Sequence, residues 1–367
     1  MFLSLLSKKL FTIFLYFSVM FPIFTLQLGD GTTVNQLSPK KIMENVIQVC
    51  ATDFNTFVLK EDGSAWGTGL NKNGILGNQT TKYSNDFVKI LVDVKKISAS
   101  DNTAVFLKKD GTLWLTGIYY NEKTKKSNGN YVASSIAKNT PFLIQNDVID
   151  VLVIKSSVFY IKIDNSLWGF GANTFGEMGL GSTEPEIIPV KIASNVKNFI
   201  SLTDLAFETL NGAKYRVTLN NTILLINKTI KHISTDLILY QDNKLFGCGF
   251  AAYGALGIGK SENHIIESET FVMEDVLTME SNNYHSLILT KDGKVFSCGG
   301  AGGDNNNTYS TFGFIGDGTT IPRFLPVLIL ENVKYIAIGS YSSFAIDKNG
   351  TLYGWGLNNA EEMLLYF

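Results

Sequence analysis

Apolar and polar residues alternate along most of this chain in one order that returns many times. Two runs rich in β-branched and aromatic residues are separated by a short polar stretch, and the second run ends in a polar turn. A third run with a central aromatic residue follows that turn. This order predicts a strand, a short loop, a second strand, a tight turn and a third strand. The clearest copies are VIQVCATDFNTFVLKEDG (46–63), VKKISASDNTAVFLKKDG (94–111), VLTMESNNYHSLILTKDG (276–293) and VKYIAIGSYSSFAIDKNG (333–350), and weaker ones occupy 148–165, 196–212 and 230–243.

The aromatic residue of the third run marks the period of the repeat. It stands at positions 66, 114, 168, 215, 246, 296 and 353, so the spacing is about fifty residues, which is typical of repeat architectures. Seven units of four short strands predict an all-β fold, a seven-bladed β-propeller. LWGFGANTFGEMGLGS (167–182) contains a G-x-G that looks like a dinucleotide-binding turn, but a turn that returns in every unit is not a phosphate site.

A glycine-rich segment follows the third run in four units, and we expect it to supply the fourth strand. The segments are NGILGNQTT (73–81), FGEMGLGST (175–183), YGALGIGK (253–260) and FGFIGDGTT (312–320). QLGDGTT (27–33) resembles such a segment, but no strands precede it. LYGWGLNNAEEML (352–364) is the first part of a unit, but its fourth segment is poor because Glu361 and Leu364 replace the glycines. We therefore expect the two ends of the chain to complete one blade and close the ring.

The pattern G-x-L-x-x-W-G-x-N-x-x-G-x-L-G-x-G, followed by a V-x-x-I strand and an H-S-L-like strand, resembles the regulator of chromosome condensation repeat family. The resemblance covers about residues 27–367 and is strongest at 165–182, 243–259 and 283–299. It implies a propeller that binds proteins. In the family's Ran exchange factor, turns between the first two strands form part of the contact face, and Asp53 is the nearest positional match here. Thr52 stands where the family's recurrent glycine precedes that position.

The first 26 residues differ from the rest of the chain. Lys8 and Lys9 precede an uncharged apolar run, residues 10–26. As a helix this run is about 25 Å long, slightly shorter than a hydrocarbon core of about 30 Å. We expect residues 1–26 to form a hydrophobic helical leader, either a signal peptide or a signal anchor, that brings the propeller of residues 27–367 to a membrane. A misassigned start codon and a buried first segment are the alternatives.

Composition and charge exclude some classes of function. The formal net charge is −2, which gives no electrostatic footprint for nucleic acid. Cys50, Cys248 and Cys298 are an odd number without a C-x-x-C pair, so we expect free buried thiols and no metal site. His285 occupies the family's recurrent repeat histidine, which we expect to be structural. No Ser-His-Asp order or paired carboxylates stand out, so the sequence predicts a protein that is not an enzyme and has no cofactor.

Two groups of residues are candidates for binding another protein. The turns between the first two strands should gather on one face of the ring, although Asp and Asn are also simply good turn residues. An insertion at 118–141 carries tyrosines and lysines on a loop, which is either functional or only mobile, and a Gly/Asn-rich excursion spans 299–314. The turn candidates are Asp53, Phe54, Asp101, Asn283, Tyr284 and Tyr341, with Asn102, Asp204 and Asp236 beside them, and the insertion candidates are Tyr119, Tyr120, Lys123, Lys125, Lys126 and Tyr131.

These observations favour a protein-binding scaffold that is secreted or membrane-anchored through residues 10–26. Sequons at Asn78 and Asn227 are compatible with that location. The alternative is an exchange factor or regulator of a small GTPase in the cytoplasm or nucleus.

Overall fold

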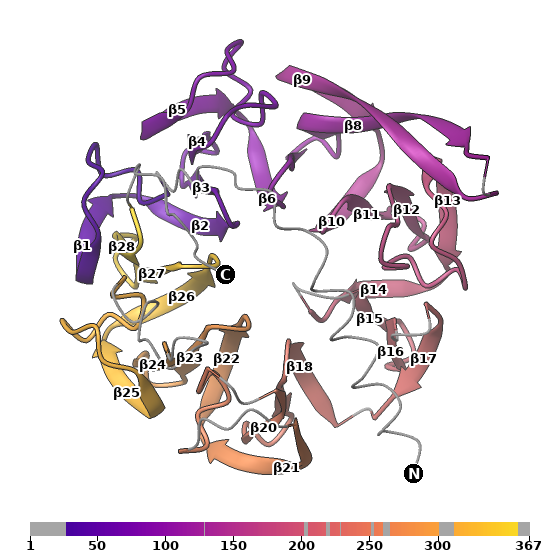
Figure 1. The fold of residues 1–367 in the computed structure, drawn as a ribbon. Coiled ribbons are helices and arrows are strands. Elements are labelled where there is room, and N and C mark those ends of the chain that lie inside the picture. The colour runs from indigo at the N-terminus through magenta and orange to yellow at the C-terminus, as the bar shows by residue number, and fades with distance from the viewer. Residues whose placement is uncertain are drawn as a thin grey trace.

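The chain folds into a ring of seven antiparallel sheets, each with four strands (Figure 1). The computed structural model describes residues 27–127, 129–201, 205–217, 221–227, 229–250, 253–259, 265–300 and 312–358. Within these residues all regular structure is strand, which confirms the all-β seven-bladed propeller. The expected leader helix of residues 10–26 lies outside the described residues, as do Asp204, Glu361 and Leu364. No described segment forms a helix that is long and apolar enough to span a bilayer.

The strands occupy four equivalent positions in blades 1 to 7, counted from the sheet that contains β2. The innermost strands are β2 (Val46–Ala51), β6 (Val94–Ala99), β10 (Val148–Ile154), β14 (Val196–Phe199), β18 (Ile230–Ser234), β22 (Val276–Ser281) and β26 (Val333–Ile338). The second strands are β3 (Asn55–Lys60), β7 (Thr103–Lys108), β11 (Ser157–Lys162), β15 (Ala206–Thr209), β19 (Leu237–Tyr240), β23 (His285–Thr290) and β27 (Ser342–Asp347). The third strands are β4 (Ala65–Gly69), β8 (Leu113–Lys125), β12 (Leu167–Gly171), β16 (Lys214–Val217), β20 (Leu245–Phe250), β24 (Val295–Gly299) and β28 (Leu352–Gly356). The outer strands are β5 (Ser84–Leu91), β9 (Tyr131–Gln145), β13 (Glu186–Ala193), β17 (Ile223–Ile226), β21 (Ile265–Met273), β25 (Arg323–Leu330) and β1 (Gln36–Met43).

The hydrophobic core lies between neighbouring blades and not within any one of them. Phe57 of blade 1 packs edge-on against Phe106 of blade 2, with ring centroids 6.3 Å apart, in a buried cluster that also contains Val94 and Ile97. The aromatic residues that mark the repeat all lie on third strands, as the sequence predicts; Trp66, for example, pairs with Val58 across the sheet. Because each blade buries its faces only against its neighbours, the ring is stable only as a whole.

The expectation that the glycine-rich segments form the fourth strands is wrong. In blade 6 the segment 312–320 forms turns, and the outer strand β25 begins only at Arg323. Gly313 and Gly316 have φ values of +69° and +91°, and the Gly316 amide donates to the Gly313 carbonyl at 3.0 Å. A strand needs negative φ throughout, so these glycines specify a loop that leads into the outer strand.

The ring closes between the two ends of the chain, as the sequence predicts. The closing strand is β1, which pairs with β28 from Gln36 opposite Gly356 to Met43 opposite Leu352. The expectation that residues 27–33 themselves provide this strand is wrong, since they form the loop that precedes it. The loop is tied to the other terminus by Asn358, whose Oδ1 accepts from the Leu28 amide at 3.2 Å.

Polar side chains link the inner strands of successive blades. The Gln48 side chain makes two hydrogen bonds with the backbone of Ile97 in the next blade, at 2.8 and 3.0 Å. Glu280 accepts from the Ile338 amide of the next blade at 3.1 Å. These bonds satisfy part of the free edge that each inner strand presents to the centre of the ring.

Candidate functional site

The insertion of residues 118–141 is a β-hairpin and not a loop. β8 and β9 contain 13 and 15 residues, whereas no other described strand exceeds nine. Their pairing continues from Leu113 opposite Gln145 to Lys125 opposite Tyr131, with one irregularity beyond Tyr120. The expectation of a loop fails because the polar residues of this segment still pair along both backbones, and a ladder of backbone hydrogen bonds needs no apolar pattern.

The hairpin is held against the neighbouring blade by an aromatic contact at its base. The Tyr119 ring lies 5.1 Å from that of Phe142 on β9 and 6.0 Å from that of Phe170 on β12 of blade 3. Both contacts are edge-on, and Tyr119 packs against the buried cluster between blades 2 and 3. Tyr119 is therefore part of the base of the hairpin, and in Figure 1 the hairpin reaches across towards β13.

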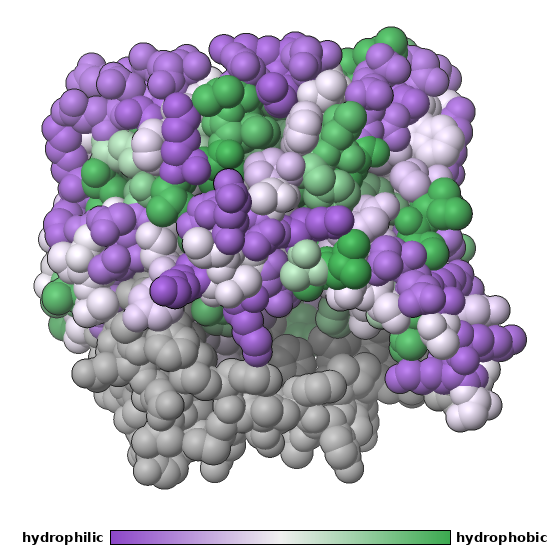
Figure 2. Space-filling view, turned by 90° about the horizontal axis from the view of Figure 1, so that it is seen from above, coloured by the Kyte–Doolittle hydropathy of each residue, from purple (hydrophilic) through white to green (hydrophobic). Residues whose placement is uncertain are grey.

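Nearer the tip, two lysines of the hairpin lie over the ring of one tyrosine. The Lys123 ammonium lies 4.7 Å from the Tyr131 ring centroid and the Lys125 ammonium 5.4 Å from it. Lys123 also forms an ion pair of 3.1 Å with Glu184, which precedes β13. Tyr120 and Tyr131 are half-buried, whereas Lys125 and Lys126 are exposed. Figure 2 shows the hairpin as the largely hydrophilic projection at the lower right of the ring.

The turns between first and second strands lie on one face, which we call the turn face. The Asp53 amide of blade 1 donates to Asp101 Oδ1 of blade 2 at 2.8 Å, and the Ser340 hydroxyl of blade 7 donates to the Asp53 carboxylate. Burial, and then the neighbouring Asp53 carboxylate, raise the pKa of Asp101 above its usual range. Phe54 is half-buried beside this pair, and Asn102 is exposed and accepts a hydrogen bond from Asn73.

An aromatic row continues the turn face through blades 5, 6 and 7. The Tyr284 ring lies 5.3 Å from that of Tyr253 and 5.0 Å from that of Tyr341, and Phe312 lies 6.2 Å from Tyr341. All four rings are half-buried, and Asn283 beside them is exposed. Sequence reasoning missed Tyr253, Phe312 and Ser340. The first two share a signal, because an aromatic residue precedes the first glycine in YGALG and FGFIG.

His285 and the cysteines have structural positions. His285 is fully buried, its Nε2 lies 2.8 Å from the Ser343 hydroxyl, and its ring centroid lies 4.8 Å from that of Phe314. Burial lowers the pKa of His285 to about 3, so the ring is neutral. Cys298 is buried, Cys50 and Cys248 are half-buried, and none of the three forms a disulfide. Among the described residues, no three His, Cys, Asp or Glu side chains group as a metal site would need.

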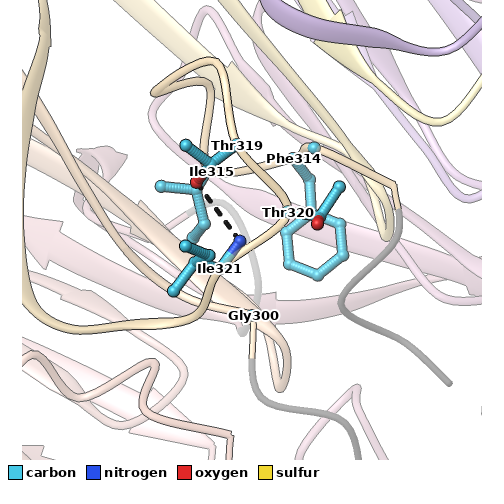
Figure 3. Close-up of a pocket in the computed structure, with 7 residues that line it drawn as sticks. Gly300, Phe314, Ile315, Thr319, Thr320 and Ile321 are labelled. Carbon is cyan, nitrogen blue, oxygen red and sulfur yellow. Dashed lines mark hydrogen bonds between the residues drawn. The ribbon is translucent and has the colours of Figure 1, made fainter. Parts of the chain in front are cut away.

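A small cleft opens beside the β24–β25 loop of blade 6 (Figure 3). Its lining includes Gly300, Phe314, Ile315 and Ile321. The lining carries only the Thr319 and Thr320 hydroxyls as polar side-chain groups. It offers no titratable group for chemistry, and the expected excursion at 299–314 lies largely outside the described residues.

Family models recognise the repeated units directly. Four segments match models of the regulator of chromosome condensation (RCC1) repeat: 46–75, 164–204, 278–309 and 333–360. The chain carries RCC1 repeats. Each matched segment includes a third strand with its aromatic residue. Two segments, 46–75 and 333–360, also contain both strands before it, and 278–309 begins within β22, so the matches fall on the units that the apolar pattern defines.

Several proteins with similar sequences or structures are known. The chain is 24% identical over 204 residues to the ultraviolet-B receptor UVR8 of Arabidopsis thaliana, which is 54% of this chain and 38% of the relative. It is 28% identical over 131 residues to the guanine nucleotide exchange factor SRM1 of Saccharomyces cerevisiae, which is 32% of this chain and 27% of the relative. The chain thus matches less than two fifths of the length of either relative. The crystal structure of human WBSCR16 has the same fold, with a TM-score of 0.64 at 14% identity, and the match covers 86% of this chain and 87% of that one.

Proposed function

We propose that this RCC1-repeat propeller is a non-enzymatic scaffold that binds another protein through the β8–β9 hairpin. The observation that carries the proposal is the anchored projection of this hairpin. Its base is fixed by Tyr119 against Phe142 and Phe170, and Lys123 is fixed by Glu184 of the next blade. A projection that is already ordered loses little conformational entropy when a partner binds.

The side chains near the tip are suited to a protein partner with acidic groups. Tyr120 and Tyr131 offer large contact areas with few rotatable bonds, and tyrosine is common among residues that dominate binding energy. Lys125 and Lys126 are exposed and can increase the association rate with an acidic partner.

The test shortens the hairpin without touching its base. Residues 121–134 are replaced by Asn-Gly, so that a two-residue turn joins Tyr120 to Ser135, which already face each other. Proteins captured from an extract of the source organism are compared between the parent, this variant and the control Tyr83→Ala, which removes an exposed tyrosine from blade 1. We expect one partner to bind the parent and the control, and its affinity for the shortened ring to fall by about 2 kcal/mol or about 30-fold. Equal affinity for the shortened ring contradicts the proposal.

The second candidate function is nucleotide exchange on a small GTPase, favoured by the similarity to SRM1. Thr52 replaces the recurrent glycine before Asp53, and we expect no exchange activity. The measurement is the release of a fluorescent nucleotide from a small GTPase of the source organism. Accelerated release by the parent would establish the exchange function in place of a passive scaffold.

We also propose that residues 1–26 direct the chain to a membrane, where the propeller is secreted or remains anchored. Lys8 and Lys9 before the uncharged run of 10–26 support this location. We expect the full chain to sediment with membranes or to be exported, and a chain without residues 2–26 to be a soluble, folded ring. A full-length chain found in the cytosol contradicts this part of the proposal.

A further inference from the structure

The aromatic row and the carboxylates of the turn face form one continuous line. Tyr253, Tyr284 and Tyr341 follow one another at 5.3 and 5.0 Å between ring centroids. Ser340, next to Tyr341, donates a hydrogen bond to Asp53, whose amide in turn donates to Asp101. Five successive blades contribute to this line. Blades 5, 6 and 7 supply the tyrosines, and blades 1 and 2 supply the aspartates.

The charges beside this line are unbalanced. Burial raises the pKa of Asp101, and the neighbouring Asp53 carboxylate lies close enough to raise it further. The pair contacts the Asp53 backbone amide and the hydroxyls of Ser340 and Thr52, and the two side chains are hydrogen-bonded to each other, so one shared proton leaves one negative charge without a cation beside it. On the same face, the Lys155 ammonium lies 4.2 Å from the Phe175 ring of its own blade. A cation brought by a partner would therefore supply the missing opposite charge.

We propose that the turn face binds an arginine-bearing segment of a partner protein, with one guanidinium on Tyr341 and the Asp53 carboxylate as its counter-charge. This surface is distinct from the β8–β9 hairpin, and the proposal does not depend on the function of the hairpin. A flat guanidinium stacks on an aromatic ring and donates two parallel hydrogen bonds to a carboxylate.

Arginine fits this arrangement better than lysine for a physical reason. The lysine ammonium is a compact and strongly hydrated charge, which loses more hydration when it lies on a ring. A purely acidic surface attracts both side chains equally, whereas a surface with an aromatic row prefers arginine. The preference for arginine over lysine therefore reports on the tyrosines, and the total affinity reports on the carboxylates.

The test uses two octapeptides as probes, one of alternating arginine and glycine and one of alternating lysine and glycine. Binding to the full chain is measured by calorimetry or fluorescence anisotropy at low salt. We expect the arginine peptide to bind about fivefold more tightly than the lysine peptide, in line with one partly desolvated cation–π contact. Affinity for both should fall as salt is raised, because surface charges are screened. Absence of binding at about 1 mM, or equal binding of the two peptides, overturns the proposal.

Two variants locate the site, and two controls match them. Tyr341→Leu keeps an apolar side chain in the row and should remove the preference for arginine. Asp53→Asn should weaken both peptides by a similar factor of about three to ten. The first control is Phe175→Ala, which removes an exposed aromatic ring that already has the Lys155 ammonium beside it. The second is Asp62→Asn, which removes one negative charge from the β3–β4 turn at the opposite end of the strands. If the controls weaken binding as much as the two variants do, the peptides bind elsewhere and the proposal is wrong.

Discussion

Asn358→Ala tests how the ring is closed. Asn358 is fully buried at the end of the third strand of blade 7, and its side chain binds the loop at the other end of the chain. Its Oδ1 accepts from the Leu28 amide at 3.2 Å, and its Nδ2 donates to Asp30 Oδ1 at 2.9 Å and to the Thr32 carbonyl at 3.0 Å. One buried and two part-buried hydrogen bonds, at about 1 kcal/mol each, predict a loss of about 3 kcal/mol in the free energy of unfolding.

Asn71 provides a matched control in blade 1. It is also fully buried, accepts from the Leu76 amide at 2.9 Å, and donates to Asn78 Oδ1 and the Thr80 carbonyl, both at 3.1 Å. The segments LGNQT and LGDGT that receive these bonds are equivalent in the repeat. Asn71 binds a loop that follows it directly, whereas Asn358 binds a loop more than three hundred residues away.

The assay combines chemical unfolding with hydrogen exchange. We expect both alanine variants to lose a similar free energy of unfolding, because they lose the same bonds. Only Asn358→Ala should release β1, so the amides of 36–43 should exchange roughly 100-fold faster, as expected for a local opening that is easier by about 3 kcal/mol. Unchanged exchange in β1, or equal acceleration by Asn71→Ala, would refute closure through this contact.

Three further predictions follow from other contacts. Gly316→Ala should cost about 2–4 kcal/mol in unfolding free energy, because a Cβ there would lie 2.5 Å from Trp355 Nε1. Gly318→Ala has a similar positive φ but open space around it, and should cost only about 1 kcal/mol. Equal costs in chemical unfolding would contradict the close packing of Gly316 on Trp355. Burial lowers the pKa of His285 to about 3, so its contribution to stability is present above pH 6.5 and is lost as the pH falls towards 3. The unfolding free energies of the parent and of His285→Gln should therefore converge over that range. A constant difference would show that His285 does not titrate this way. Tyr119→Ala should detach the hairpin, which would be seen as faster hydrogen exchange in 118–125 with little change elsewhere in the ring. The shortened variant keeps Tyr119 and should unfold at the same denaturant concentration as the parent.

The repeated units and the closure of the ring could be predicted from the sequence because both depend on local patterns. The third strands are buried between neighbouring blades on both faces, and the aromatic residue at Trp66 and its equivalents is half-buried, so each strand is a short apolar run bounded by polar turns. The third strands, the seven-fold repetition and the joining of the termini therefore follow from the order of residues alone. The mistakes arose where the backbone, not the apolar pattern, decides. Gly313 and Gly316 form a loop through positive φ, and the polar residues of β8 and β9 pair through main-chain hydrogen bonds.

The candidate binding surfaces depend on contacts that no single repeat contains. Tyr119 stands in a segment rich in polar residues, where the sequence predicts an exposed side chain, but it packs on Phe170 of the next blade. Ser340 and Asp53 are separated by 287 positions in the chain and meet only because the ring closes. A local sequence pattern records which runs are buried strands and which are polar turns. It does not record which residue of the neighbouring blade lies opposite, because that is decided by the angle and stacking of complete blades around the ring.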